Sequence, residues 1–156
     1  MIKILFVCLG NICRSPMAQG IMESKIHKKG LGGKVLTDSA GTANYHVDEA
    51  PDPRTLTALR RNGIELVHKG QQFKEAHLQE FDYILAMDRN NLEDIQKKVG
   101  KSSKVFLMRD FDRVEKGADV PDPYYGGVDG FEKIYTILNR SIEHFMQDKI
   151  VDVSSR

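Results

Sequence analysis

The side chains best suited to chemistry lie near the N-terminus, in the segment Cys8-Leu-Gly-Asn-Ile-Cys-Arg-Ser15. A loop between Cys8 and Arg14 can point several backbone N–H groups at one anion. A helix that begins behind it adds unpaired donors and the positive end of its dipole, and both effects favour the nucleophilic thiolate of Cys8. Arg14 can bind two oxygens with its planar guanidinium. The segment therefore predicts a loop that holds a phosphate group against a thiolate.

The Cys-x5-Arg spacing is weakly specific by itself, and its surroundings strengthen it. An apolar run, Ile2–Val7, comes directly before Cys8 and is typical of a strand. Ser15 suits the N-cap of a helix and Pro16 its first position, and apolar residues then recur at helical spacing. The alternative is that Cys8 is a small buried apolar residue at the end of a strand.

The composition is that of an ordinary globular protein. With 156 residues we expect one domain, 1–156, whose last residues, 151–156, form a flexible tail. A net charge of +1 gives no sign of a nucleic-acid partner, and no apolar run is long enough for membrane insertion. The chain shows no signal-peptide pattern, and two cysteines in one short segment form no disulfide framework. We therefore expect a cytoplasmic protein with free thiols.

Strand and helix patterns alternate along the chain. Strands are predicted at Ile2–Val7, Val35–Ala40, Tyr83–Met87 and Lys104–Met108. Five helices are predicted. The first runs from Ser15 to about Lys29, the second from Pro53 (capped by Asp52) to near Gly63, and a short third one ends at Glu80. The fourth is capped by Asp88, and the last follows the apolar face from Phe131 to Phe145. This order predicts a three-layer α/β/α fold with a central four-stranded parallel sheet and the phosphate loop after the first strand.

Ligands of such folds bind beyond the carboxyl ends of the strands. Cys8, Ser39, Asp88 and the segment after Met108 each follow a predicted strand, so we expect them at one edge of the sheet. That segment runs to Gly127 without periodicity, and loops of this length tend to be functional or disordered.

A carboxylic acid on this long loop would complete a phosphatase site. Attack by a thiolate on a phosphate monoester expels an alkoxide or phenoxide, which needs a proton. Asp122, between two prolines, is the best candidate, although a solvated turn aspartate would look the same. Asp112, Asp119 and Asp129 are its rivals. Tyr124 and Tyr125 suit either a pocket for an aromatic leaving group or an anchor of the loop on the core.

With these motifs together, the sequence resembles the low-molecular-weight protein-tyrosine phosphatases from Ile2 to about Met146. The matching segments are Val7–Pro16, Asp38–Thr42, Pro51–Arg54, Ala86–Asp88 and Asp122–Gly126. Two ordered motifs at opposite ends of the chain make the resemblance far more specific than the first loop alone.

The resemblance implies hydrolysis of phosphotyrosine through a phosphocysteine on Cys8. Arg14 would bind the phosphate oxygens and stabilise the transition state. Asp122 would protonate the leaving group and then activate water, and Ser15 would donate to the Cys8 sulfur. The partners would be tyrosine-phosphorylated proteins or peptides, with inorganic phosphate as product. No cofactor and no metal are implied, and the sequence has no clustered ligand set.

The resemblance also implies roles around these three residues. Asn11, in a left-handed conformation, would hold the loop through bonds to Ser15, Ser39 and His68. The phosphate-binding loop would include Leu9, Gly10, Asn11, Ile12 and Cys13, and the substrate cleft Ile12, Tyr45, Tyr124 and Tyr125. Cys13 is either a packing residue or the thiol that traps an oxidised Cys8 as a disulfide.

Three other functions fit parts of the pattern. Phosphoarginine phosphatases of the same superfamily tend to have a threonine where Ile12 stands and one aromatic residue after the Asp-Pro pair, so apolar Ile12 and the Tyr124-Tyr125 pair favour phosphotyrosine. An arsenate reductase on this loop needs a cysteine beyond Cys8 and Cys13, which the chain lacks. A binding module that only captures phosphate would lack the nucleophile or the acid.

Overall fold

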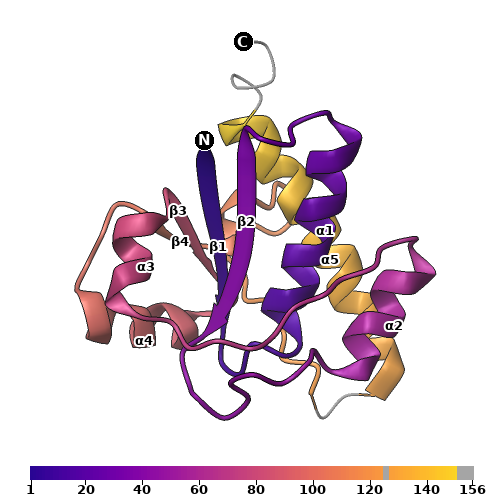
Figure 1. Ribbon diagram of the computed structural model, residues 1–156, viewed down its shortest axis with the longest axis horizontal. Coiled ribbons are helices and arrows are strands. Elements are labelled where there is room, and N and C mark those ends of the chain that lie inside the picture. The colour runs from indigo at the N-terminus through magenta and orange to yellow at the C-terminus, as the bar shows by residue number, and fades with distance from the viewer. Residues whose placement is uncertain (125–126, 151–156) are drawn as a thin grey trace.

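A four-stranded parallel sheet forms the centre of the molecule, as the alternating pattern predicts. The computed structural model describes residues 1–124 and 127–150. Its strands are β1 (Ile2–Cys8), β2 (Val35–Gly41), β3 (Tyr83–Ala86) and β4 (Val105–Leu107), in the order β2-β1-β3-β4 with every neighbouring pair parallel. The carboxyl ends of β1 and β2 therefore lie side by side at one edge of the sheet (Figure 1).

Helices cover both faces of the sheet (Figure 1). The helices are α1 (Arg14–Lys28), α2 (Pro53–Arg61), α3 (Glu75–Glu80), α4 (Arg89–Val99) and α5 (Gly127–Lys149), with a short 3₁₀ helix, η1, at Met108–Phe111. Helices α1, α2 and α5 pack on one face, and α3 and α4 on the other. The three-layer α/β/α prediction is thus confirmed.

Strand β1 explains why the layers form. Its side chains point alternately to the two faces, and nearly all of them are apolar. Ile4 and Phe6 belong to the core beneath α1 and α5, whereas Leu5 and Val7 belong to the core beneath α3 and α4. Because β1 is central and buried on both faces, it fixes the position of Cys8 at its end.

Two aspartates cap helices as expected. The Asp52 carboxylate accepts from the backbone N–H of Arg54, and the Asp88 carboxylate accepts from that of Asn91, at 2.8 Å in both cases. These caps place the starts of α2 and α4 close to the edge where β1 ends.

The prediction that Ser15 caps the first helix is wrong. Helix α1 begins at Arg14, its N-cap position is Cys13, and no side chain caps it. Ser15 instead lies within the first turn of the helix. Its hydroxyl is hydrogen-bonded with the Cys8 sulfur and therefore does not cap the helix. The segment after Met108 is also less irregular than expected, since it opens with η1.

Candidate active site

A pocket of about 290 Å³ opens at the carboxyl end of β1. It is lined by Cys8, Leu9, Gly10, Ile12, Cys13, Arg14, Tyr45, His46, Asp122 and Tyr124. The loop after β1, the segment after β2 and the loop after η1 all contribute to it, so the structure brings together segments that are far apart in the sequence. Tyr125, also expected in the cleft, lies outside the described residues.

The loop after β1 is shaped by close backbone packing. Asn11 has φ of +57°, the left-handed conformation that asparagine tolerates. Gly41, at the end of β2, lies so near that an added Cβ would come within 2.7 Å of the Leu9 carbonyl. The N–H of Thr42 donates to the Cys8 carbonyl at 2.9 Å. The end of β2 therefore supports the loop from outside, and only glycine leaves it room.

The Asn11 side chain holds the loop from inside, with the bonds that the resemblance implies. The Gln71 N–H donates to Oδ1 of Asn11 at 3.0 Å, which fixes Oδ1 as the oxygen because a backbone N–H only donates. His68 Nε2 lies 2.8 Å from the same oxygen and must donate as well. The Nδ2 amide then donates to Ser15 and Ser39, at 2.9 and 3.0 Å.

The Ser15 hydroxyl has two possible acceptors for its proton. Ser15 Oγ accepts from Asn11 and lies 2.9 Å from Cys8 Sγ and 3.5 Å from the Ala40 carbonyl. When Cys8 is a thiolate it can only accept, so the Ser15 hydroxyl then donates to the sulfur. Ser39 Oγ likewise accepts from Asn11 and donates to Gln19 Oε1 at 2.6 Å. A chain of hydrogen bonds thus directs the Ser15 hydroxyl at the sulfur.

His68 and Ser39 lie behind the loop and do not line the pocket. Burial lowers the pKa of His68, although the Asp38 carboxylate opposes this shift. The bond to Asn11 requires a proton on Nε2, which the neutral ring can carry. His68 therefore supports the shape of the loop at neutral pH.

Arg14 connects the loop after β1 to the N-cap of α4 and to the loop after η1. Its side chain is 3% exposed, and Nη1 donates to Asp88 at 2.6 Å and to the Val120 carbonyl at 2.9 Å. Nη2 lies 3.8 Å from the Asp122 carboxylate. Burial opposes the charge of Arg14, but Cys8 and Asp88 raise its pKa above the ordinary value. A permanent cation therefore lies at the base of the pocket.

Among the four candidate acids, Asp122 is the one that lines the pocket. Asp112 is fully buried in ion pairs with Arg109 and Arg140, Asp119 bonds to the N–H of Arg89, and Asp129 lies in the first turn of α5. Asp122 keeps 46% of its side chain exposed, and one oxygen accepts from the Tyr124 N–H at 3.0 Å. Its position suits an acid that exchanges protons with a ligand.

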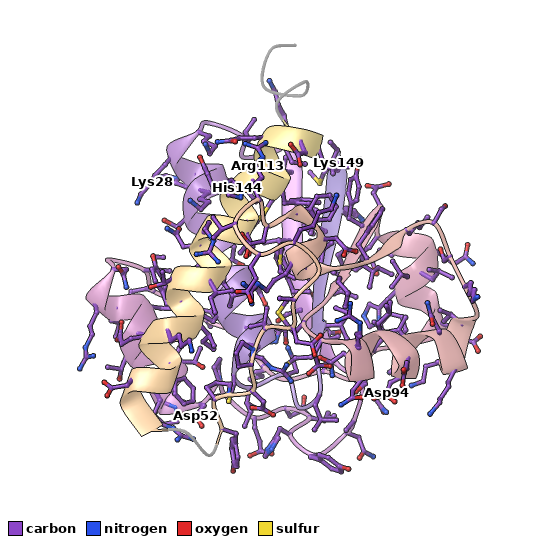
Figure 2. The ribbon with its side chains drawn as sticks, turned by 180° about the vertical axis from the view of Figure 1, so that it is seen from behind. Lys28, Asp52, Asp94, Arg113, His144 and Lys149 are labelled. Carbon is purple, nitrogen blue, oxygen red and sulfur yellow. The ribbon has the colours of Figure 1, made fainter. Side chains whose placement is uncertain are left out.

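Tyr45 and Tyr124 form the rim of the pocket. Tyr45 is 70% exposed, and Tyr124 is 38% exposed. The Arg54 guanidinium lies 5.6 Å from the centre of the Tyr124 ring and 4.5 Å from that of Phe131. Asp52 pairs with the same guanidinium (Figure 2 labels Asp52). The start of α2 therefore supports the Tyr124 ring at the rim of the pocket.

Cys13 shares the pocket with Cys8, and both thiols are free. Burial, with smaller contributions from Asp52 and Cys8, raises the pKa of Cys13 above its ordinary value. Cys13 is therefore a neutral thiol beside the sulfur that Ser15 contacts.

Comparison with known proteins agrees with this geometry. The family model of the low molecular weight phosphotyrosine protein phosphatases matches residues 3–154. The phosphatase of this description from Schizosaccharomyces pombe is 43% identical over 149 residues, with 94% of this chain and 96% of that protein covered. The chain belongs to the low-molecular-weight phosphotyrosine protein phosphatase family. It is an enzyme of the protein-tyrosine-phosphatase class.

Solved structures of the family and its relatives have the same fold. A protein tyrosine phosphatase from Entamoeba histolytica superposes with a TM-score of 0.91 at 37% identity and covers 95% of this chain and 96% of its own. The Drosophila arginine phosphatase also superposes, with a TM-score of 0.87 at 31% identity, covering 97% of this chain and 99% of its own. The fold is thus shared by proteins named for two kinds of phosphorylated residue.

Within residues 1–124 and 127–150, no group of three or more acidic, histidine or cysteine side chains is placed to hold a metal ion. No helix in the same ranges is long and apolar enough to cross a membrane. The described lining of the pocket includes the thiols of Cys8 and Cys13, the Arg14 guanidinium and the Asp122 carboxyl group.

Sequence reasoning missed three residues of the site. Asp88 was expected only at a strand end and as a helix cap, yet its second oxygen binds Arg14. Gln71 fixes the Asn11 amide from a segment without any motif. His46 lines the pocket and pairs with Glu49 at 2.9 Å. The position of His46 directly after Tyr45 was the available signal, whereas nothing in the sequence pointed to Gln71.

Proposed function

We propose that this enzyme hydrolyses phosphotyrosine in proteins or peptides through a phosphocysteine on Cys8, as one phosphatase domain over 1–156. In the first step the Cys8 thiolate attacks phosphorus and the bond from phosphorus to the phenolic oxygen breaks. Arg14 and the backbone donors of the loop bind the phosphoryl oxygens, where charge develops. Asp122 gives its proton to the departing phenolate.

The second step returns the enzyme to its starting state. The Asp122 carboxylate takes a proton from water, and the oxygen attacks phosphorus as the phosphorus–sulfur bond breaks. The Ser15 hydroxyl stabilises the leaving thiolate through its bond to Sγ, and inorganic phosphate is released. The reaction needs Cys8 reduced, which the cytoplasm favours, and we place the enzyme there.

One observation supports this mechanism most strongly: Cys8, Arg14 and Asp122 line one pocket, and the Asp122 carboxylate lies 3.8 Å from the Arg14 guanidinium. The pocket walls also fit an aryl group, since Ile12, Tyr45 and Tyr124 are apolar or aromatic. A phosphate-binding module would need neither an acid nor a hydroxyl directed at the sulfur.

The test compares purified enzyme on matched peptides that carry phosphotyrosine, phosphoserine or phosphoarginine. We expect kcat/KM to be highest for phosphotyrosine by at least about tenfold, because the pocket complements a flat ring. Equal turnover of phosphoserine would contradict the proposal.

A phosphoarginine phosphatase is the second candidate, favoured by the likeness to the Drosophila arginine phosphatase. Ile12 argues against it, because a branched apolar side chain offers no hydrogen bond to a guanidinium. Exchange of Ile12 for threonine should shift the ratio of kcat/KM toward phosphoarginine, with Ile12→Val as the apolar control. If the ratio stays the same in both variants, Ile12 does not set the preference.

A further inference from the structure

A buried arginine, Arg109, fastens the loop that carries Asp122. Arg109 belongs to η1, directly after β4, and is only 3% exposed. The loop begins at Asp112 and ends at Asp122, which lines the pocket. Its second residue, Arg113, pairs with α5 at the end of the molecule away from Asp52 (Figure 2). A loop of this length needs anchors to hold a side chain in one place.

Each nitrogen of the Arg109 guanidinium has a partner in this loop. Nε donates to Asp112 at 3.0 Å, Nη2 to Glu115 at 2.8 Å, and Nη1 to the Asp119 carbonyl at 2.9 Å. The backbone carbonyl of Arg109 also accepts from the Gly117 N–H at 2.8 Å, where Gly117 has φ of +80°. The loop is therefore wrapped around one guanidinium.

Asp112 holds Arg109 in place from behind. Burial alone would raise the pKa of Asp112, but hydrogen bonds from Arg140, the Val114 N–H and Arg109 hold it well below its ordinary value. Arg140 reaches Asp112 from α5 with two bonds of 2.9 Å. The carboxylate is thus charged at neutral pH and ties Arg109 to the longest helix.

The contact with Asp119 leads directly to the pocket. The next residue, Val120, is fully buried, its N–H donates to the Met87 carbonyl at 2.8 Å, and its carbonyl accepts from Arg14 at 2.9 Å. Proline on both sides of Asp122 then limits the backbone. The position of Asp122 therefore depends on Arg109 through the hydrogen-bonded residues Asp119 and Val120.

We propose that Arg109 is a positioning residue that holds the Asp122 carboxyl over the pocket for proton transfer. The inference rests on the proposed role of Asp122 as the acid. Without the bonds from Arg109, the loop moves and protonation of the leaving group weakens. Phosphate binding stays unchanged because Arg14 and the loop after β1 are intact.

The test uses Arg109→Lys, which keeps a charge beside Asp112 but cannot reach all three acceptors. The matched control is Arg140→Lys, whose ammonium can still pair with Asp112 from α5 and which leaves all three Arg109 bonds in place. The measurement is kcat/KM for phenyl phosphate, whose leaving group needs a proton, relative to 2,4-dinitrophenyl phosphate, whose leaving group does not. We expect this ratio to fall about tenfold in Arg109→Lys and to stay at the wild-type value in Arg140→Lys. The inhibition constant of inorganic phosphate should not change in either variant.

An unchanged ratio in Arg109→Lys, or equal falls in both variants, would overturn the inference. Glu115→Gln is the second variant, because Glu115 is 69% exposed and its loss leaves the core intact. It should lower the ratio about two- to threefold, and an unchanged ratio overturns the inference if Arg109→Lys does not fold.

Asp122→Ala in the same assay separates the two proposals. If the ratio is unchanged in Asp122→Ala, Asp122 is not the acid and the proposed function fails. If the ratio falls in Asp122→Ala but in neither Arg109→Lys nor Glu115→Gln, only the role of Arg109 is rejected.

Discussion

The Ser15 hydroxyl lies 2.9 Å from the Cys8 sulfur and donates to it when Cys8 is a thiolate, which can only accept. Asn11 donates to the Ser15 oxygen and leaves its hydrogen free for the sulfur. A hydrogen bond to an ionised group stabilises it by about 1.5–3 kcal/mol. Ser15 therefore matters most when the thiolate leaves phosphorus, in the second step.

Replacement of Ser15 by alanine should slow the second step about ten- to hundredfold, by the strength of that bond. Rapid mixing with p-nitrophenyl phosphate should show a burst of nitrophenolate followed by slow turnover. Ser141→Ala is the control, since Ser141 is equally buried but bonds within α5. Loss of the burst together with turnover would mean that Ser15 acts mainly in the first step.

Asp122→Ala should lower kcat/KM for phenyl phosphate by about 10²- to 10⁴-fold, the usual contribution of a general acid. The loss should be smallest for activated aryl phosphates, which release a stable phenolate without a proton. Asp129→Ala, on α5, serves as the control and should resemble the wild type. Equal losses for all leaving groups would count against acid catalysis by Asp122.

Stability should fall on the acidic side of neutrality because of His68. Burial holds the pKa of folded His68 below the value of about 6.5 of an unfolded histidine, so the unfolded chain binds more protons. The contribution is complete above about pH 6.5 and is lost as the pH falls toward the folded value. Urea unfolding at several pH values should show a smaller loss for His68→Gln, whose amide can still donate to Asn11. Identical pH dependence in both proteins would contradict this assignment.

Cys13 should protect Cys8 from irreversible oxidation. Peroxide converts the Cys8 thiolate to a sulfenic acid, which the Cys13 thiol attacks to form a disulfide and water. Wild-type activity should therefore return with a thiol reductant, whereas that of Cys13→Ser should be lost increasingly with time. Equal recovery of both proteins would leave Cys13 a packing residue.

The sequence predicted those parts of the site that local patterns determine. The apolar run before Cys8 and the spacing to Arg14 locate the loop, and the proline-flanked Asp122, the proposed acid, lines the same pocket. Asn11 also has the expected left-handed backbone and hydrogen bonds. Each of these features follows either from residues that are neighbours in the chain or from a motif that the sequence shares with the family.

Pairings between distant segments were not predictable. Arg14 with Asp88, Asn11 with Gln71 and Arg109 with Asp119 depend on how the loops pack at the sheet edge. Ser15 was assigned to a cap because its type and its place before Pro16 suit one. Tertiary contact with Cys8 gave its hydroxyl another partner, and the N-cap position is Cys13, two residues earlier.

The central claim is a phosphoryl group on Cys8, and trapping it is the most direct test. Ser15→Ala enzyme, mixed with p-nitrophenyl phosphate and quenched within the burst, should carry one phosphoryl group, which peptide mass spectrometry should locate on Cys8. The Cys8→Ala variant should carry none and turn over no substrate. Turnover with no phosphorylated residue, or a phosphoryl group on any side chain other than Cys8, would contradict the mechanism.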